Sequence, residues 1–240
     1  MTERFCQLVL YEDPSNISSF LTQFNDEFDL NQPMENGVNA FSYACLYDKK
    51  EALEILLKDE RIEVNEPIQD GLTAFYRVCE LKKVEALKVL LGNEKVDVNK
   101  GDYYGTTPFA IACWKGHEEI VKRMVRNERV DINKKMEKGE SPIFILSTEG
   151  NFELIKYLIA SGREIDLSST ANRQKGLSMA IKWNLPKDLE LYSKATKDYL
   201  SPLDAAQIMG HHDVFLLLSS YQSKPGYTTE RLRQGLKYFG

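Results

Sequence analysis

The amino-acid sequence repeats itself with a period of 34 residues. Three series of identical residues keep this interval in one common register. The series are Asn31, Asn65, Asn99 and Asn133, then Gly37, Gly71, Gly105 and Gly139, and then Glu51, Glu85, Glu119 and Glu153. A period of about 20–50 residues indicates stacked supersecondary units, none of which can bury its apolar face alone. The repeat therefore predicts a solenoid that is stabilised by contacts between neighbouring units.

The clearest unit can be interpreted residue by residue. Gly105 can supply the positive φ of a tight turn. Thr107 followed by Pro108 is a favourable helix start, because Thr caps the helix and Pro loses no hydrogen bond at the first helical position. The predicted elements are a helix over 108–114, a break at Gly116, a second helix over about 118–126 and an extended exit over 129–133. Each unit is thus predicted to be a helix–turn–helix followed by an extended finger.

This unit resembles the ankyrin repeats. Residues 105–125 read GTTPFAIACWKGHEEIVKRMV, and the family pattern is G-x-T-P-L-H-x-A-A-x-x-G-H-x-E-I-V-x-x-L-L. Asp131-Ile132-Asn133 also matches the D-V/I-N ending of the family. The histidine that ties neighbouring turns together in the family is absent from every unit, so the resemblance does not supply the hydrogen bonds between the fingers. The resemblance covers about 35–220 and implies an all-α ankyrin-repeat solenoid with projecting β-turn fingers.

The repeat register predicts a single domain of about seven units, terminal caps included. The interval from Pro142 to Pro202 is 60 residues, eight fewer than two periods, so one unit is predicted to be truncated. The predicted boundaries are an N-terminal cap over 1–34, regular units over 35–68, 69–102, 103–136 and 137–170, a truncated unit over 171–196, and a last unit with a C-terminal capping helix over 197–240.

Composition excludes several classes of protein. The 240 residues carry a net charge of −5, which disfavours binding to the nucleic-acid phosphate backbone. No apolar run approaches the roughly 18 residues of a membrane span. The apolar stretch near the N-terminus is short and flanked by acidic residues, unlike a signal peptide. We therefore expect a monomer in the cytoplasm, with the nucleus as an open alternative, and reduced cysteines.

The residues with potential chemistry follow the repeat. Cys45, Cys79 and Cys113 are 34 residues apart, so they occupy one core position of successive units. Packed helices lie about 10 Å apart, which is too far for a disulfide or a shared zinc ion. His117 and His211 follow the glycine between two helices, and no third ligand is in register with them. We predict no metal, no cofactor and no catalytic site.

The surface that stacking does not use is the predicted binding site. In the ankyrin family the finger tips and the exposed side of the first helices form a concave groove for protein partners. Aromatic residues on this groove suit such contacts. The predicted partner-binding residues are Tyr47, Leu81, Tyr103, Tyr104, Trp114, Lys115 and Trp183. The alternative is that Leu46 and Leu81 pack between units and that Trp183 fills space left by the truncation.

The resemblance implies a non-enzymatic protein–protein interaction module, such as an adaptor, an assembly chaperone or an inhibitor of another protein. One alternative is a secreted microbial effector that engages host proteins, although no export signal is readable. A remote alternative is an enzyme that uses the divergent region 171–200. The polar residues available there are Arg173, Lys175, Lys182, Lys187, Asp188 and Glu190. No nucleophile and base stand in register among them.

Overall fold

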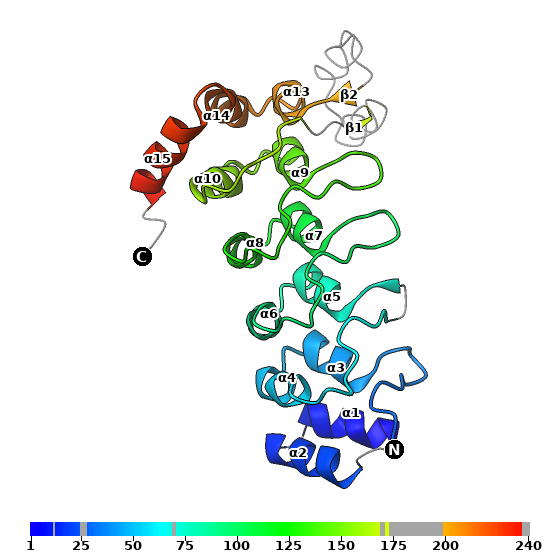
Figure 1. The fold of residues 1–240 in the computed structure, drawn as a ribbon. Helices are drawn as coiled ribbons and strands as arrows, with labels where there is room; N and C mark the ends of the chain where they lie inside the picture. Colours follow the sequence, from blue (N-terminus) through cyan, green and yellow to red (C-terminus); the bar gives the residue numbers. More distant parts are fainter. Residues whose placement is uncertain (12, 25–27, 69–70, 169–170, 173–198, 237–240) are drawn as a thin grey trace. The chain divides into compact units, whose positions relative to one another are not determined.

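The computed structural model describes the chain except for residues 12, 25–27, 69–70, 169–170, 173–198 and 237–240 (Figure 1). The chain divides into two compact units, Met1–Tyr103 and Tyr104–Gly240. We call them the N-terminal half and the C-terminal half and describe each by itself. The described residues form thirteen helices and one pair of two-residue strands.

The N-terminal half consists of three helix pairs in two rows. Its helices are α1 (Thr2–Tyr11), α2 (Pro14–Gln23), α3 (Ala40–Leu46), α4 (Lys50–Leu56), α5 (Ala74–Glu80) and α6 (Val84–Leu91). The first helices α1, α3 and α5 pack in one row, and the second helices α2, α4 and α6 pack in the other. The connections into α3 and α5 form fingers on the side of the first helices (Figure 1).

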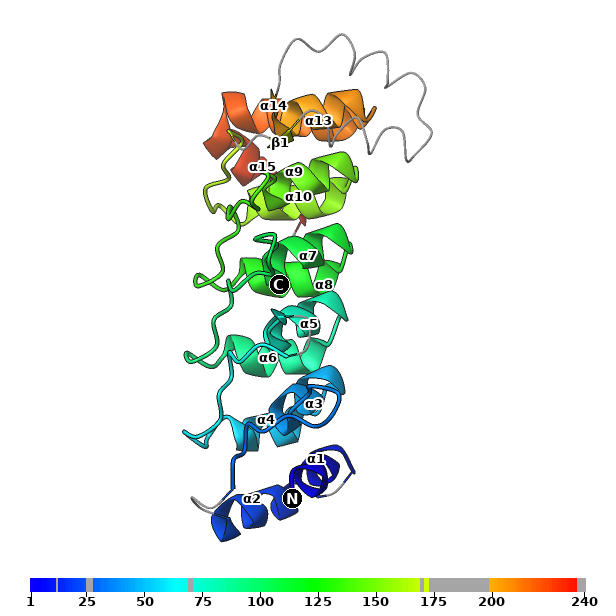
Figure 2. The same cartoon turned by 90° about the vertical axis from the view of Figure 1, so that its right-hand side faces the viewer.

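The C-terminal half repeats this arrangement. Its elements are α7 (Pro108–Trp114), α8 (Glu118–Val125), α9 (Pro142–Thr148), α10 (Phe152–Ala160), β1 (Ala171–Asn172), β2 (Tyr199–Leu200), α13 (Pro202–Ile208), α14 (His212–Ser223) and α15 (Pro225–Leu236). The first helices α7, α9 and α13 form one row, and α8, α10 and α14 form the other. Helix α15 packs against α10 and α14 (Figure 2). The predicted helix-turn-helix stacking is therefore confirmed in each half.

Local sequence explains where the first helices begin. At every first helix after α1, a short polar side chain accepts a hydrogen bond from the backbone N–H three residues further on, which satisfies one of the helix's unpaired donors. These N-caps are Asn39, Thr73, Thr107, Ser141 and Ser201. The predicted start at Thr107 and Pro108 is confirmed, since Thr107 Oγ1 lies 3.1 Å from the N–H nitrogen of Ala110.

The glycine series marks the finger turns. Gly37, Gly71, Gly105 and Gly139 all have a φ between 72° and 88°, a region in which glycine has no steric penalty. Two backbone hydrogen bonds close the turn at Gly71. The Gly71 N–H donates to the Ile68 carbonyl (3.0 Å), and the Ile68 N–H donates to the Leu72 carbonyl (2.8 Å). The invariance of this position in the repeat therefore has a backbone cause.

The core lies between the two helix rows of each half. Leu53 and Leu56 on α4, and Leu87 and Leu90 on α6, are completely buried. Leu91 is only half-buried because it stands at the end of α6. Residues at helical spacing on the second helices thus provide the apolar layer that the sequence pattern predicted.

The structure differs from the prediction of a truncated unit over 171–196. Helix α9 packs directly against α13, and α10 packs against α14. The His211 ring, at the start of α14, also lies beside Gly150 and 3.0 Å from the Thr148 carbonyl oxygen through Nε2. The helix pairs on either side of the predicted truncated unit are therefore consecutive neighbours, with no further pair stacked between them. Residues 173–198 themselves lie outside the described residues.

A short antiparallel strand pair joins the described residues on the two sides of this segment. Ala171 pairs with Leu200, and Asn172 pairs with Tyr199. The described residues on the two sides of 173–198 therefore lie next to each other (Figure 1). The Pro142-to-Pro202 interval exceeds one period by 26 residues, which is the length of 173–198. The interval is explained by an insertion between two units.

Candidate functional site

We call the side of each half that carries the fingers and the first helices the finger face. The finger of a unit is the segment that runs from the second helix of the preceding unit to the first helix of that unit, for example 57–73 between α4 and α5. The predicted partner-binding residues other than Trp183 stand on the fingers or at the ends of the first helices. Their positions depend on how the fingers are held together.

The asparagine series joins consecutive fingers. Each carboxamide donates from Nδ2 to a backbone carbonyl about 30 residues ahead and accepts at Oδ1 from a backbone N–H two residues after that carbonyl. The described bridges are Asn31 with Arg61 (2.7 Å) and Glu63 (2.9 Å), Asn65 with Lys95 (2.7 Å) and Asp97 (2.7 Å), and Asn133 with Glu164 (2.8 Å) and Asp166 (3.0 Å). These side chains provide hydrogen bonds between the fingers although the family histidine is absent. Asparagine suits this position because its amide is both donor and acceptor.

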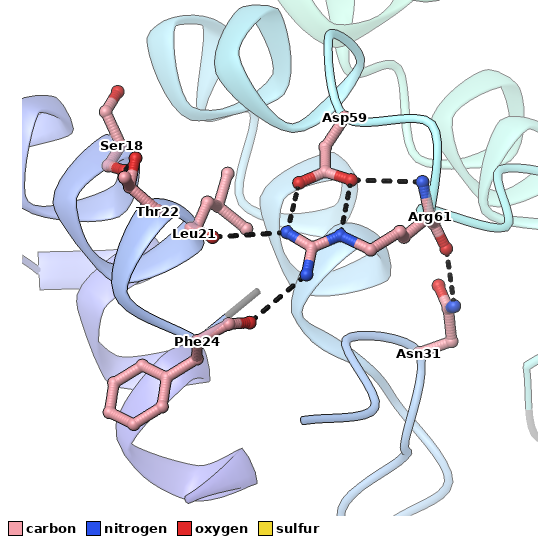
Figure 3. Close-up of polar contacts among 7 residues, drawn as sticks. All are labelled: Ser18, Leu21, Thr22, Phe24, Asn31, Asp59 and Arg61. Atoms are coloured by element: carbon pink, nitrogen blue, oxygen red, sulfur yellow. Dashed lines mark hydrogen bonds and ion pairs between the residues drawn. The ribbon is translucent and has the colours of Figure 1, made fainter. Parts of the chain in front are cut away.

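An arginine also fixes the finger 57–73 to the end of α2 (Figure 3). The Arg61 guanidinium donates to the carbonyls of Phe24 (3.1 Å) and Leu21 (3.2 Å) at the end of α2. Asp59 holds the guanidinium in place from the other side at 2.6 Å. A cation at a helix C-terminus is favourable because the last carbonyls lack helical partners and carry partial negative charge.

The same device recurs in the C-terminal half. Arg163 donates to the carbonyls of Val125 (3.3 Å) and Val130 (2.6 Å) beyond the end of α8. Arg233 on α15 donates to the carbonyls of Ala160 (2.8 Å) and Ser161 (3.0 Å) at the end of α10. The capping helix α15 is therefore attached by the same type of contact that attaches a finger.

The predicted residues of the N-terminal half are exposed on its finger face. Tyr47 follows α3 and is 56% exposed, and Leu81 follows α5 and is 49% exposed. Tyr103 is 77% exposed, and its ring lies so close to Gly71 that a Cβ there would come within 2.6 Å of it. The exposure of Leu81 disagrees with the alternative that it packs between units.

The predicted residues of the C-terminal half are also exposed. Tyr104 lies on the finger before α7, where its carbonyl accepts a hydrogen bond from the Glu137 N–H of the next finger (3.0 Å). Trp114 is the last residue of α7 and is 53% exposed, and Lys115 follows it as an exposed residue. Trp183 lies outside the described residues.

Two tyrosines, the half-buried Tyr43 and the exposed Tyr11, were missed by the sequence reasoning. Tyr43, one turn before Tyr47 on α3, stacks on the Tyr47 ring with centroids 5.9 Å apart, and its hydroxyl accepts a hydrogen bond from Asn36 Nδ2 (2.6 Å). Tyr11 ends α1 and is 81% exposed. The repeat register could not place Tyr11, because the N-terminal cap lacks the glycine from which the register is counted. Tyr43 could have been found as a helical i, i+4 partner of Tyr47.

The cysteines lie in the core. Cys6, Cys45, Cys79 and Cys113 are all buried, and no disulfide joins them. Burial, with a smaller contribution from Glu3, raises the pKa of the Cys6 thiol to about 11, and burial raises the pKa of the other three well above the ordinary value. Within the described part of the chain, no group of three or more His, Cys, Asp or Glu residues could hold a metal ion.

The comparison with known proteins identifies the repeats. Residues 43–136 match the family of ankyrin repeats, in three copies. Residues 43–136 are ankyrin repeats. The structure of the ankyrin repeat protein EF0377 superposes with a TM-score of 0.69 at 18% identity, covering 92% of this chain and 98% of that one. An ankyrin repeat domain from Acinetobacter baumannii AYE gives 0.64 at 18% identity, covering 90% and 95%. No curated protein sequence matches the chain.

The ankyrin-repeat assignment supports a general function. Ankyrin repeats generally mediate protein–protein interaction and are generally non-enzymatic. The described helices include none that is long and apolar enough to cross a membrane. The family likeness does not identify a partner, and the solved structures share only the fold at this level of identity.

Proposed function

We propose that this ankyrin-repeat chain binds another protein through its finger face, and that it works as an adaptor, an assembly chaperone or an inhibitor of that protein. The observation that carries the proposal is the exposure of large aromatic side chains on this face in both halves. Tyr47, Tyr103, Tyr104 and Trp114 are each more than half exposed.

Exposure of these residues has a cost that suggests a function. Large apolar side chains in water forgo the free energy of burial, about 1.5–3 kcal/mol for a full side chain. Tryptophan and tyrosine are also the side chains that contribute most at protein interfaces. Their positions at the ends of first helices and on the fingers leave the stacking contacts of the helix rows undisturbed.

The experiment compares variants of the full chain as baits in quantitative affinity capture, followed by measurement of the dissociation constant with the purified partner. Trp114→Ala and Tyr47→Ala test the finger face. Tyr227→Ala is the matched control, because Tyr227 is 65% exposed on α15, away from the finger face. At least one of the two finger-face variants should raise the dissociation constant about thirtyfold, which corresponds to about 2 kcal/mol.

Thermal unfolding of the same variants separates binding from folding. The melting temperature of Trp114→Ala should stay close to that of the wild type, because the indole does not contribute to the core. A large fall in melting temperature with intact binding would contradict the proposal, and so would loss of binding in Tyr227→Ala alone.

A further inference from the structure

The two halves of the chain differ in charge. Residues 1–103 contain 20 acidic and 11 basic residues, a net charge of −9. Residues 104–240 contain 16 acidic and 20 basic residues, a net charge of +4. The modest net charge of the whole chain therefore conceals a strongly acidic N-terminal half. Such a field attracts oppositely charged partners and raises their association rate.

The finger face of the N-terminal half carries two tyrosine rings that are held in place by contacts within the chain. The rings of Tyr43 and Tyr47 are stacked within 14° of parallel, and the Asn36 amide holds the Tyr43 hydroxyl. Although it stacks on Tyr43, Tyr47 remains more than half exposed. A tyrosine held in this way loses little side-chain freedom on binding, which lowers the entropic cost of a contact.

Carboxylates belong to the same face. Glu35 is exposed on the finger tip, next to the Asn36 that contacts Tyr43. Burial raises the pKa of Tyr76 on α5, and the charges of Asp102 and Glu80 raise it further. Glu80 is the last residue of α5, and Asp102 lies on the finger before α7. The cation of α5, Arg77, forms an ion pair with Glu80 at 2.6 Å.

We propose, as a refinement of the proposed function on which it rests, that the N-terminal half binds a basic segment of the partner protein, with an arginine side chain lying on the exposed Tyr47 ring. Arginine is favoured over lysine because its planar guanidinium stacks on aromatic faces and is more weakly hydrated. A cation over a tyrosine ring is attracted by the ring's electron density. The exposed Glu35 carboxylate and the net negative charge of the N-terminal half attract the rest of the basic segment.

The experiment selects random 12-residue peptides displayed on phage against the full chain, and then measures the selected peptides as synthetic, fluorescently labelled probes. We expect net positive peptides in which arginine outnumbers lysine. Their affinity should fall when salt is raised from about 50 to 300 mM, because screening weakens the attraction. Replacing the key arginine of a peptide by lysine should weaken binding about threefold or more.

Variants locate the binding site. Tyr47→Ala should weaken binding about fivefold or more, whereas Tyr47→Phe keeps the ring and should bind nearly as the wild type. Glu35→Gln should weaken binding more than Glu54→Gln, which removes the same charge from the exposed surface of α4.

The outcomes distinguish this inference from the function on which it rests. Selection of acidic or neutral peptides that lose affinity in Trp114→Ala would overturn the inference and leave the finger face as the binding site. Peptides that bind Tyr47→Ala and Trp114→Ala as well as the wild type would contradict both. Equal effects of Glu35→Gln and Glu54→Gln would show that only the net charge attracts the peptide, and would overturn the assigned site.

Discussion

The Asp48 side chain accepts a hydrogen bond from the backbone N–H of Ala86 at 2.6 Å, across 38 residues of sequence. Ala86 lies in the first turn of α6, whose own N-cap, Lys83, makes no side-chain cap bond. One unit therefore caps the second helix of the next. Asp48 does this from a left-handed conformation with a φ of 57°, at the turn where three later helix pairs have Gly116, Gly150 and Gly210.

Asp48→Ala should lower the free energy of unfolding by about 0.5–2 kcal/mol, because the first turn of α6 loses its only described side-chain cap. Urea unfolding followed by circular dichroism measures the change. Lys82→Ala is the matched control, since Lys82 has the same φ of 57° and its exposed side chain caps none of the described helices. Equal losses in the two variants would show that the cap contributes nothing.

Lys82→Gly should raise the free energy of unfolding by about 0.5–1 kcal/mol. The left-handed conformation costs a residue with a Cβ about 1–2 kcal/mol, and glycine avoids this cost. Glycine also gives the unfolded chain more conformational entropy, which offsets part of the gain. The urea midpoint should increase with an unchanged slope. The prediction is wrong if the midpoint falls, because the entropy cost of glycine would then exceed the relief of strain.

Asn65→Ala should lower the free energy of unfolding by about 1–3 kcal/mol, because it removes both hydrogen bonds that join two fingers. Asn65→Asp keeps the acceptor atom and loses the donor. Hydrogen exchange of the Asp97 amide separates the two variants. This amide should exchange faster in Asn65→Ala and nearly as in the wild type in Asn65→Asp, and unchanged exchange in Asn65→Ala would exclude the bridge from the solution structure.

Asp59 should make stability depend on pH in the acid range. Hydrogen bonding from the Arg61 side chain, and then from its backbone, holds the pKa of Asp59 below its ordinary value of 3.8 in the folded chain. A carboxylate with a lowered folded pKa stabilises the fold above its ordinary pKa, and this contribution is lost as the pH falls through the folded value. Between pH 6 and pH 3 the wild type should therefore lose more stability than Asp59→Asn. Parallel pH profiles for the two proteins would refute this assignment.

The four cysteines should be unreactive in the folded chain. Thiolate is the reactive form, and burial both raises the thiol pKa and excludes the reagent. A disulfide reagent at pH 8 should modify the native protein only at the rate of its opening, and should modify four thiols per chain in denaturant. Rapid modification of even one native thiol would place that cysteine at the surface.

Much of the fold could be predicted because the residues that start and end the helices of a repeat act on neighbours close in sequence. Thr107 and Pro108 start a helix by short-range hydrogen bonding and a fixed φ, and Gly105 permits the turn before it. The exposure of Trp114 and Leu81 followed from the same register. Tyr11 could not be found in this way, because the N-terminal cap does not share the glycine series.

The sequence by itself determined the period, the helix pairs and the buried positions, since these depend on contacts within a unit and on apolar spacing. Only the tertiary structure decided which residues of one unit contact or hydrogen-bond residues of another unit. A 60-residue interval is consistent with two shortened periods or with one period and an insertion, and the packing of α9 on α13 selects the insertion. The bridges made by Asn65 and the cap made by Asp48 connect groups more than 30 residues apart. Such partners depend on how neighbouring units are stacked, which no local pattern specifies.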